Sequence, residues 1–392
     1  MKYDFDEIID RRNTDSAKWD AVGLRFGNEN AWPMWVADTD FRSPRPVLEA
    51  LEARVRHGVF GYTYSGPAYN QSLAAWMRER HGWAPDETWV SLAPGVLAGL
   101  VMCLEAFTEP GDGVLLQTPV YYPFFSVIRD NGRRMVKSDL GFAAGRYEMD
   151  LGDLEDRVRS ENVKALILCS PHNPIGRAWS REELTRLGEI CLEYGVFVLS
   201  DEIHSDLVYP PLRHVPFASI SDEFAQNSMT AVSTSKTFNL PALQDAAIII
   251  PDPERRRKYE DLLKARKMAM RNVLGMAASE AAWRHGRDYL DQLLEYLKGN
   301  LEFAKAFLAE RAPEIRVVEP EATYLVWLDC RALDLDHRAL SDFMTHQAEV
   351  ALDPGHWFGE PGRGFMRMNI GCPRSTLARG LERLAKAVAG RR

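Results

Sequence analysis

The sequence predicts an α/β fold in which a mainly parallel sheet lies between helices, followed by a smaller α+β domain. Two observations carry this prediction. Short, continuous apolar runs alternate with helical patterns between about residues 88 and 250, as expected for parallel strands buried on both faces. After about residue 285, one long amphipathic helix precedes strands in which apolar and polar residues alternate.

The first part of the chain has no periodic pattern. Residues 1–45 contain aromatic residues and prolines, and we expect an arm that lies on another surface. A helix is predicted over 46–57, where Val47, Leu51 and Val55 share one face. A second helix is predicted over 72–81, after a turn-rich aromatic stretch.

The expected strands of the sheet are short and apolar: 88–92, 114–117, 164–169, 196–199, 229–232 and 247–250. A helix over 96–107 is predicted after Pro94-Gly95. Another is predicted after Ser180, which has the spacing of a capping box with Glu183. Folds of this class bind ligands beyond the C-terminal ends of their strands, so the polar motifs that follow the strands are candidates for a site.

Leucines from Leu290 to Leu308 predict a long helix that ends before Pro313. Half-buried strands are expected over 324–328 and 365–370, and a closing helix over 373–389. We therefore predict three parts: an N-terminal arm (1–45) that joins the small domain, a large domain that contains the parallel sheet (46–285) and a small C-terminal domain (286–392).

The composition excludes several classes of protein. The 392 residues carry a formal net charge of −8 without a basic block, so we expect no nucleic-acid partner. The five cysteines are scattered and odd in number, as for free thiols in a reducing compartment. The N-terminus lacks the apolar core of a signal peptide, and no apolar run approaches the ~20 residues of a membrane span. We expect a cytoplasmic protein.

Lys236 is the first candidate for chemistry. It follows an apolar strand and the small residues Ser233, Thr234 and Ser235. An amine held in a pocket there has a lowered pKa and attacks carbonyl groups. An exposed lysine on a turn is the alternative interpretation of this motif by itself.

Two further motifs follow buried strands. Asn173 lies in a rigid Pro-His-Asn-Pro turn, where its amide can bind a phenolate or a carboxylate oxygen; a purely structural turn is the alternative. A buried carboxylate at Asp201 needs a cation and can hold a proton on a heterocyclic nitrogen, or it can cap a helix. Asp201, Glu202 and His204 fit no strong metal-ligand pattern, so we expect no metal.

Weaker signals complete the set. Gly95 and Val96 open an apolar helix whose N-terminal amides suit a phosphate, although Pro-Gly is often only a turn. Tyr121 can stack on a flat ring or pack in the core. Arg367 lies in an apolar strand and needs an anion, either a ligand carboxylate or a structural partner. Together these groups are what pyridoxal 5′-phosphate requires, and the glycine-rich signatures of nucleotide cofactors are absent.

The chain resembles the fold-type I pyridoxal-phosphate enzymes of the aspartate aminotransferase superfamily, and more narrowly the cystathionine β-lyase (C–S lyase) branch of the MalY/PatB kind. The matching stretches are 35–41, Gly61-Tyr62, 94–96, 119–121, 169–174, 200–204, 235–239, 323–329, 367–369 and 371–374.

The resemblance implies roles for individual residues. Lys236 is the Schiff-base lysine, and the expected catalytic residues are Lys236, Tyr62 and Tyr121. The expected cofactor-binding residues are Gly95, Val96, Tyr121, Asn173, Asp201, His204, Ser233, Ser235, Lys236 and Tyr62. Tyr62 is expected to reach the phosphate of a neighbouring subunit, which implies a homodimer with shared sites. The expected substrate-binding residues are Val36, Ala37, Asn173 and Arg367.

Three positions depart from the aminotransferase pattern. His204 stands where aminotransferases usually have a tyrosine, and Gln244 stands where they usually have a phosphate-binding arginine. Both differences recur in the lyase branch and favour a lyase, although Gln244 leaves the charge of the phosphate unbalanced. Thr39 stands where methionine is common.

The expected activity is β-elimination from cystathionine or another S-substituted L-cysteine, which yields a thiol, pyruvate and ammonia. In this scheme Lys236 takes the Cα proton while Asp201 keeps the ring nitrogen protonated. The alternatives are a class I/II aminotransferase, a biosynthetic enzyme that cleaves or oxidatively deaminates a bulky S-cysteinyl conjugate, and a binding protein without turnover. The bulky-substrate alternative depends on four aromatic residues expected near the entrance: Trp19, Trp32, Trp35 and Trp357.

Overall fold

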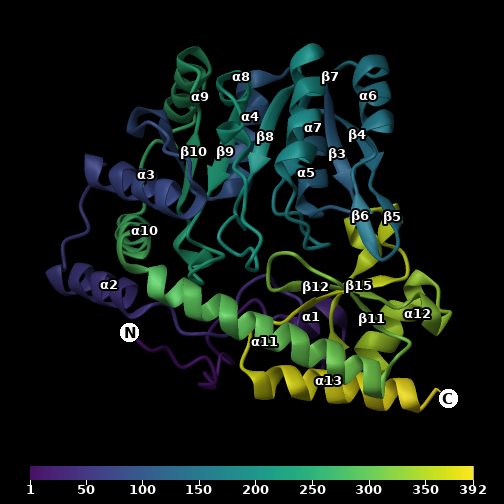
Figure 1. Ribbon diagram of the computed structural model, residues 1–392. Helices are drawn as coiled ribbons and strands as arrows, with labels where there is room; N and C mark the ends of the chain where they lie inside the picture. The colour runs from purple at the N-terminus through teal and green to yellow at the C-terminus, as the bar shows by residue number, and fades with distance from the viewer. Residues whose placement is uncertain (392) are drawn as a thin grey trace.

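A seven-stranded sheet forms the centre of the larger part of the molecule (Figure 1). The structure is a computed structural model, and it describes residues 1–391. The strand order is β2-β10-β9-β8-β7-β3-β4. Their bounds are β2 Val90–Ala93, β3 Gly113–Thr118, β4 Arg134–Asp139, β7 Val163–Cys169, β8 Phe197–Asp201, β9 Ser228–Val232 and β10 Ala246–Ile249. β10 runs antiparallel to both of its neighbours, and every other neighbouring pair is parallel.

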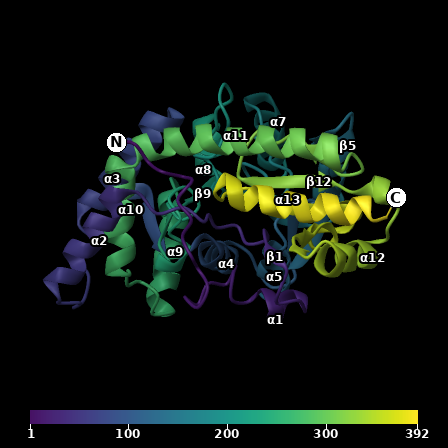
Figure 2. The same cartoon turned by 90° about the horizontal axis from the view of Figure 1, so that it is seen from below.

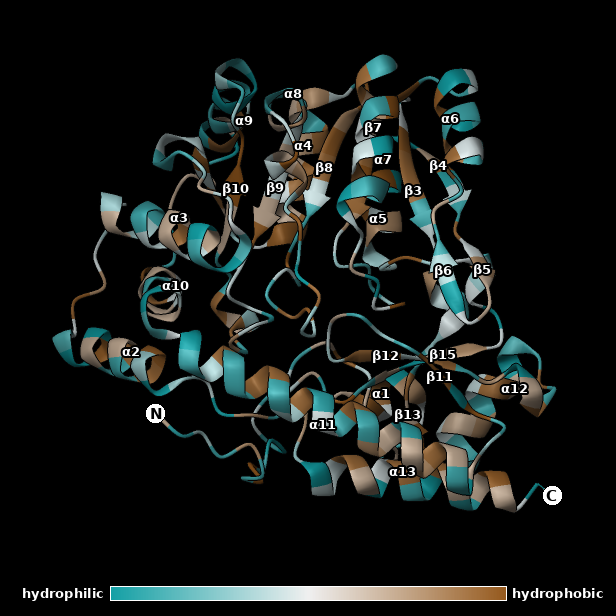
Figure 3. Ribbon diagram, in the orientation of Figure 1, coloured by the Kyte–Doolittle hydropathy of each residue, from teal (hydrophilic) through white to brown (hydrophobic). Residues whose placement is uncertain are grey.

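Helices cover both faces of this sheet, because successive side chains of its strands point to opposite faces. Ala165 and Ile167 of β7 pack in a cluster with side chains of α4, α5 and α9, whereas Leu166 and Leu168 pack with side chains of α6, α7 and α8. These helices are α4 Val96–Phe107, α5 Pro123–Arg129, α6 Leu151–Ser160, α7 Arg181–Glu193, α8 Asp222–Gln226 and α9 Pro253–Ala265. Strands such as β7 and β8 are accordingly mostly apolar (brown in Figure 3), whereas the edge strand β4 also carries hydrophilic residues. The predicted fold class is confirmed.

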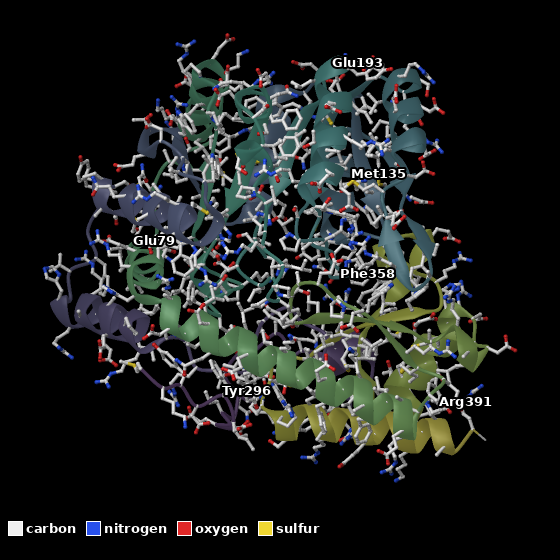
Figure 4. All side chains as sticks on the ribbon, viewed as in Figure 1. Glu79, Met135, Glu193, Tyr296, Phe358 and Arg391 are labelled. Carbon is white, nitrogen blue, oxygen red and sulfur yellow. The ribbon has the colours of Figure 1, made fainter. Side chains whose placement is uncertain are left out.

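A second, four-stranded antiparallel sheet has the order β11-β12-β15-β14. Its strands are β11 Arg316–Val318, β12 Leu325–Asp329, β14 Asp353–Pro354 and β15 Phe365–Asn369. The long helix α11 (Arg287–Arg311) and the C-terminal helix α13 (Arg374–Ala389) lie side by side beside this sheet (Figure 2). The leucines that predicted α11 are buried in one cluster with side chains of this sheet and of α13. Phe358, labelled in Figure 4, lies where the two sheets meet.

The remaining elements are short or peripheral. They are α1 Val22–Phe26, α2 Arg45–His57, α3 Pro67–His81, α10 Val273–His285, α12 His337–Asp342, β1 Trp32–Pro33, β13 Val350–Ala351 and the hairpin β5 Gly141–Ala143 with β6 Arg146–Glu148. The predicted helix over 72–81 is longer than expected, because Pro67 is tolerated in the first turn, where a helix needs no N–H. The capping box at Ser180 is present.

The first 45 residues lie on α11, α13 and β13. The amino group of Met1 pairs with Asp288 at 3.0 Å, and β1 pairs in parallel with β13. Inside the arm, Lys18 is only 1 % exposed, and its Nζ donates to Asp40 Oδ2 at 2.7 Å. The three-part division at residues 45/46 and 285/286 stays a prediction. Among the described residues, no helix is both long and apolar enough to cross a membrane.

Candidate functional site

A cavity of about 280 Å³ lies beyond the C-terminal ends of the parallel strands. Its lining residues are Ala37, Pro94, Gly95, Val96, Leu97, Ala98, Tyr121, Cys169, Asn173, Asp201, Ile203, His204, Ser233, Ser235, Lys236, Pro241, Gln244 and Asp245. Apart from Ala37 of the N-terminal arm, they follow or end five different strands, β2, β3, β7, β8 and β9. The cavity therefore lies where an α/β sheet of this kind binds its ligands.

Lys236 projects into this cavity from the turn that follows β9. Its Nζ donates to the carbonyl of Ala37 at 2.7 Å, so it is not the exposed lysine of the alternative interpretation. Burial lowers the pKa of Lys236 to about 8, with a smaller lowering by Arg367, while Asp38 and Asp201 oppose the shift. At neutral pH about a tenth of the amine is therefore uncharged and nucleophilic, far more than for an ordinary lysine.

Asp201 ends β8 and is 4 % exposed. Its carboxylate accepts one hydrogen bond, from the backbone N–H of Ile203 at 3.1 Å, and it forms no ion pair with any residue between 1 and 391. Burial raises the pKa of Asp201 to about 7, although Lys236 opposes the shift. A buried carboxylate in this state is stabilised by a cationic N–H group that enters the cavity.

The N-terminus of α4 forms another wall. The helix begins at Val96 after Gly95, no side chain caps it, and Val96, Leu97 and Ala98 line the cavity. Its free amides and dipole favour a phosphate group. Gln244 also lines the cavity. Among the described residues, Lys236 is the one lysine or arginine that lines it.

Ser233 and Ser235 also line the cavity. Ser233 Oγ already donates to the carbonyl of Asp245 at 2.7 Å and accepts from the N–H of Ser235 at 3.1 Å. The Ser233 hydroxyl therefore shapes the turn that carries Lys236, and it has to rotate before it can donate to a ligand.

Asn173, Tyr121 and His204 complete the lining. Asn173 Oδ1 accepts from Arg367 Nη1 at 2.9 Å, which leaves the amide N–H₂ to donate to a ligand. Burial lowers the pKa of His204 well below its ordinary value, so its imidazole is neutral at neutral pH. Burial raises the pKa of the Tyr121 phenol, which therefore stays protonated.

Three of the residues expected from the sequence do not line the cavity. Arg367 is 2 % exposed and lies behind Asn173, and Val36 offers its carbonyl to Asn369 Nδ2. Tyr62 is 95 % exposed, in a stretch between α2 and α3 without regular structure. A single subunit therefore does not bring Tyr62 to its own cavity.

The four tryptophans expected near the entrance do not line this cavity either. Trp19 and Trp32 pack edge to face, with their ring centroids 5.3 Å apart. Trp35 Nε1 donates to the carbonyl of Lys18 at 3.1 Å, and Trp357 stacks on Phe26. Packing accounts for all four rings, and they lend no support to a bulky substrate.

Sequence reasoning missed two groups beside the site. The hydroxyl of Tyr324 donates to the Ala37 carbonyl at 3.1 Å, next to Lys236 Nζ. Asp353 forms a buried ion pair with Arg367 across β14 and β15. An arginine in an apolar strand signalled that an anion was needed, but the anion itself could not be located without the register of the strands.

These groups fit pyridoxal phosphate, which the sequence led us to expect. The amine of Lys236 suits an aldehyde, the unpaired carboxylate of Asp201 suits a protonated ring nitrogen, and the uncapped start of α4 suits a phosphate. All three line one cavity.

Comparison with known proteins gives consistent relatives. The family model "Aminotransferase class I and II" matches residues 37–384. The chain is 45% identical over 385 residues to the cystathionine beta-lyase PatB of Bacillus subtilis, covering 98% of this chain and all of PatB. It is 36% identical over 388 residues to the protein MalY of Escherichia coli, covering 98% of this chain and 99% of MalY.

Among solved structures, cystalysin from Treponema denticola, described as containing a pyridoxal 5′-phosphate cofactor, superposes with a TM-score of 0.97. The two chains are 36% identical, and each is covered completely. The protein therefore belongs to the class I and II aminotransferase family, and within it to the group of relatives that includes PatB and MalY.

Proposed function

We propose that this protein is a pyridoxal-phosphate-dependent C–S β-lyase, which cleaves cystathionine or another S-substituted L-cysteine to a thiol, pyruvate and ammonia. The observation that carries the proposal is the cavity that combines the Lys236 amine, the unpaired Asp201 carboxylate and the free start of α4. The relative PatB is a cystathionine beta-lyase, and cystalysin contains the cofactor.

Bound pyridoxal phosphate supplies an aldehyde that captures amines and a ring that withdraws electrons from the substrate Cα. The side chains have separate tasks. With the cofactor bound, the Nζ of Lys236 would hold it through its aldehyde and would serve as the base for the Cα proton of the substrate. The carboxylate of Asp201 keeps a proton on the ring nitrogen, and the amide of Asn173 orients the ring through its oxygen.

The remaining groups bind and orient. The amides at Gly95 and Val96 would bind the phosphate, and the ring of Tyr121 would provide an aromatic surface for the cofactor. Arg367 binds the α-carboxylate of the substrate, since it is the guanidinium next to Asn173. The neutral imidazole of His204 contributes no charge beside the ring.

His204 and Gln244 favour a lyase over an aminotransferase, because both stand where aminotransferases usually have other residues. The decisive assay supplies holoenzyme with cystathionine and measures pyruvate and thiol with and without a 2-oxo acid. We expect both products in equal amounts without any acceptor, and no activity from Lys236→Ala. Turnover that requires a 2-oxo acid, with the thioether bond intact, contradicts the lyase and supports an aminotransferase.

We further propose a homodimer that shares its active sites. The stretch between α2 and α3 exposes Val59, Phe60, Tyr62 and Tyr64, and such a patch suits a second copy of the chain. In this dimer Tyr62 reaches the phosphate bound by the neighbouring subunit.

Hybrid dimers test this arrangement. Tyr62→Phe and Lys236→Ala subunits, each weakly active or inactive alone, are mixed and allowed to exchange. If Tyr62 serves the neighbouring site, a hybrid contains one site with both defects and one intact site, so activity returns to about half of one wild-type dimer. No recovery after proven exchange contradicts a shared site.

Two further proposals follow from the chain as a whole. We propose that residues 1–45, 46–285 and 286–392 act as arm, large domain and small domain, with the cavity lined by the large domain and by Ala37 of the arm. We also propose a cytoplasmic location, since all five cysteines are buried free thiols. Limited proteolysis of the apoprotein tests the first, and localisation of a tagged chain tests the second.

A further inference from the structure

The guanidinium of Arg367 lies behind the cavity and is linked to it by its hydrogen bond to Asn173. Arg367 on β15 and Asp353 on β14 face each other in the small sheet, and their side chains are 2 % and 0 % exposed. Asp353 Oδ2 accepts from Arg367 Nη2. The proposed mechanism gives Asp353 no task, although it holds the group that is assigned to the substrate carboxylate.

The hydrogens of Arg367 are unevenly used. Nη2 has two hydrogens, and both are engaged, by Asp353 and by the carbonyl of Trp35 at 3.0 Å. Nη1 donates to Asn173 at 2.9 Å. Nε is buried and has no partner among residues 1–391.

A guanidinium can grip a carboxylate with two parallel hydrogen bonds along either of two edges, Nη1/Nη2 or Nη2/Nε. Both edges include Nη2, whose hydrogens are already engaged. A bidentate substrate carboxylate therefore has to displace an acceptor from Nη2.

Asp353 is the acceptor that fits displacement. It holds Arg367 through a single hydrogen bond, because its Oδ1 and Arg367 Nε are both buried without a partner among the described residues. The carbonyl of Trp35, by contrast, is neutral and is fixed in the backbone next to Val36 and Ala37. Two ionised carboxylates beside one buried guanidinium also repel each other.

We propose that Asp353 is an exchangeable counter-ion of Arg367, which a substrate carboxylate replaces on Nη2 as Asp353 takes up a proton. The inference rests on the proposed role of Arg367 in the lyase and concerns the regulation of that same site. Carboxylate binding is then coupled to proton uptake, and the free site holds no uncompensated arginine charge.

The surroundings of Asp353 are compatible with this exchange. The charged and titratable groups that face it are Arg367 on β15, Arg25 on α1, and Tyr121 and Tyr122 after β3. Burial raises the pKa of Asp353 to about 6, and the two arginines oppose the shift. Protonation is therefore accessible near neutral pH while Arg367 is paired, and more so once that pairing is lost.

The test uses holoenzyme and 3-(methylthio)propionate, a substrate-like carboxylate without the α-amine, so that no covalent exchange with the cofactor occurs. Calorimetry in two buffers with different ionisation enthalpies gives the affinity and the number of protons taken up. The matching primary amide is the uncharged control ligand. Asp353→Asn removes the charge of the side chain and keeps its shape. Asp329→Asn is the control variant, because Asp329 ends β12 of the same sheet and also pairs with an arginine, Arg331, at 2.7 Å.

For the wild type we expect uptake approaching one proton at pH 8 and an affinity for the carboxylate that falls about tenfold per pH unit above pH 6. In Asp353→Asn the carboxylate should bind more tightly at pH 8, by up to about 100-fold, with about one proton fewer taken up. The Asp329→Asn variant should behave like the wild type.

Weaker carboxylate binding in Asp353→Asn with unchanged proton uptake overturns the proposal, because Asp353 then only orients Arg367. If Asp353→Asn does not fold, the wild type decides: an affinity independent of pH between 6 and 8, without proton uptake, overturns the exchange. Equal binding of the carboxylate and the amide overturns both the exchange and the role of Arg367. The pyruvate assay is separate, so a failed lyase and a failed exchange give different results.

Discussion

Two carboxylates five residues apart, Asp201 and Asp206, are both buried and have opposite surroundings. Asp206 accepts hydrogen bonds from Trp76 Nε1 at 3.0 Å, from Thr237 Oγ1 at 2.9 Å and from the His81 ring at 2.9 Å. These partners lower the pKa of Asp206 against the effect of burial, whereas the pKa of Asp201 is raised to about 7.

The difference separates a structural group from one that is kept ready for a ligand. Asp206 ties the loop after β8 to Thr237, next to Lys236, and its ionised form is satisfied within the protein. Asp201 has no such partners, so the folded chain alone bears the cost of burying it. Unsatisfied groups of this kind gather at functional sites.

The largest expected effect comes from Asp201→Asn in the holoenzyme. Without the carboxylate, nothing holds the ring proton, and we expect kcat for β-elimination to fall by about 10³-fold. In Asp206→Asn, kcat should fall by less than about tenfold, because the side chain of Asp206 does not line the cavity. Steady-state pyruvate release measures both variants, and similar losses would contradict the comparison.

The two substitutions should change the stability of the apoprotein in opposite directions at pH 8. Asp206→Asn loses hydrogen bonds to a charged group and should lower the free energy of unfolding by about 2 kcal/mol. The folded pKa of Asp201 lies above its unfolded value, so its ionised form destabilises the fold above about pH 7 and this penalty fades as the pH falls. Asp201→Asn should therefore stabilise at pH 8, as urea unfolding would show; a loss of stability would contradict the comparison.

The apoprotein should capture the cofactor with a pH dependence set by Lys236. Only the neutral amine attacks an aldehyde, so the rate of binding should rise with pH, with a midpoint near pH 8, where half of the amine is neutral, and a plateau at higher pH. Stopped-flow absorbance between pH 6 and 10 measures this. A midpoint near 10, the ordinary value for lysine, would show that the amine is not desolvated.

A smaller effect is expected at Gln244. Arginine at this position places a cation near the start of α4 and should tighten cofactor binding several-fold, as for a charge-assisted hydrogen bond. Gln244→Ala is the matched control and should not tighten it. Equilibrium dialysis gives both constants, and no gain from arginine would show that the phosphate lies elsewhere.

The sequence predicted what depends on local pattern. The continuous apolar run 164–169 identified β7, and its polar successor Asn173 was correctly expected at the strand end. The direction of β10 was not accessible, because a buried strand has the same apolar pattern in either direction. Strand β4 escaped notice because its exposed positions, such as Arg134 and Lys137, make an edge strand look like a loop.

At the site, local motifs located the side chains that follow strands, whereas pairings across the chain stayed hidden. Asp353 lies on the two-residue strand β14, and only the register of β14 against β15 brings it to Arg367. Tyr324 reaches Lys236 through the carbonyl of Ala37, which is 287 residues away from it in sequence. Such contacts depend on tertiary packing, which no short motif encodes.

The central claim is that Lys236 is the amine that holds the cofactor, and borohydride reduction tests it directly. Reduction of the holoenzyme fixes the cofactor covalently to its amine, and mass spectrometry of the peptides locates the label. We predict one label per chain, on the peptide that contains Lys236, and none in Lys236→Ala. A label on another lysine, or unlabelled protein that still turns over substrate, would contradict the account.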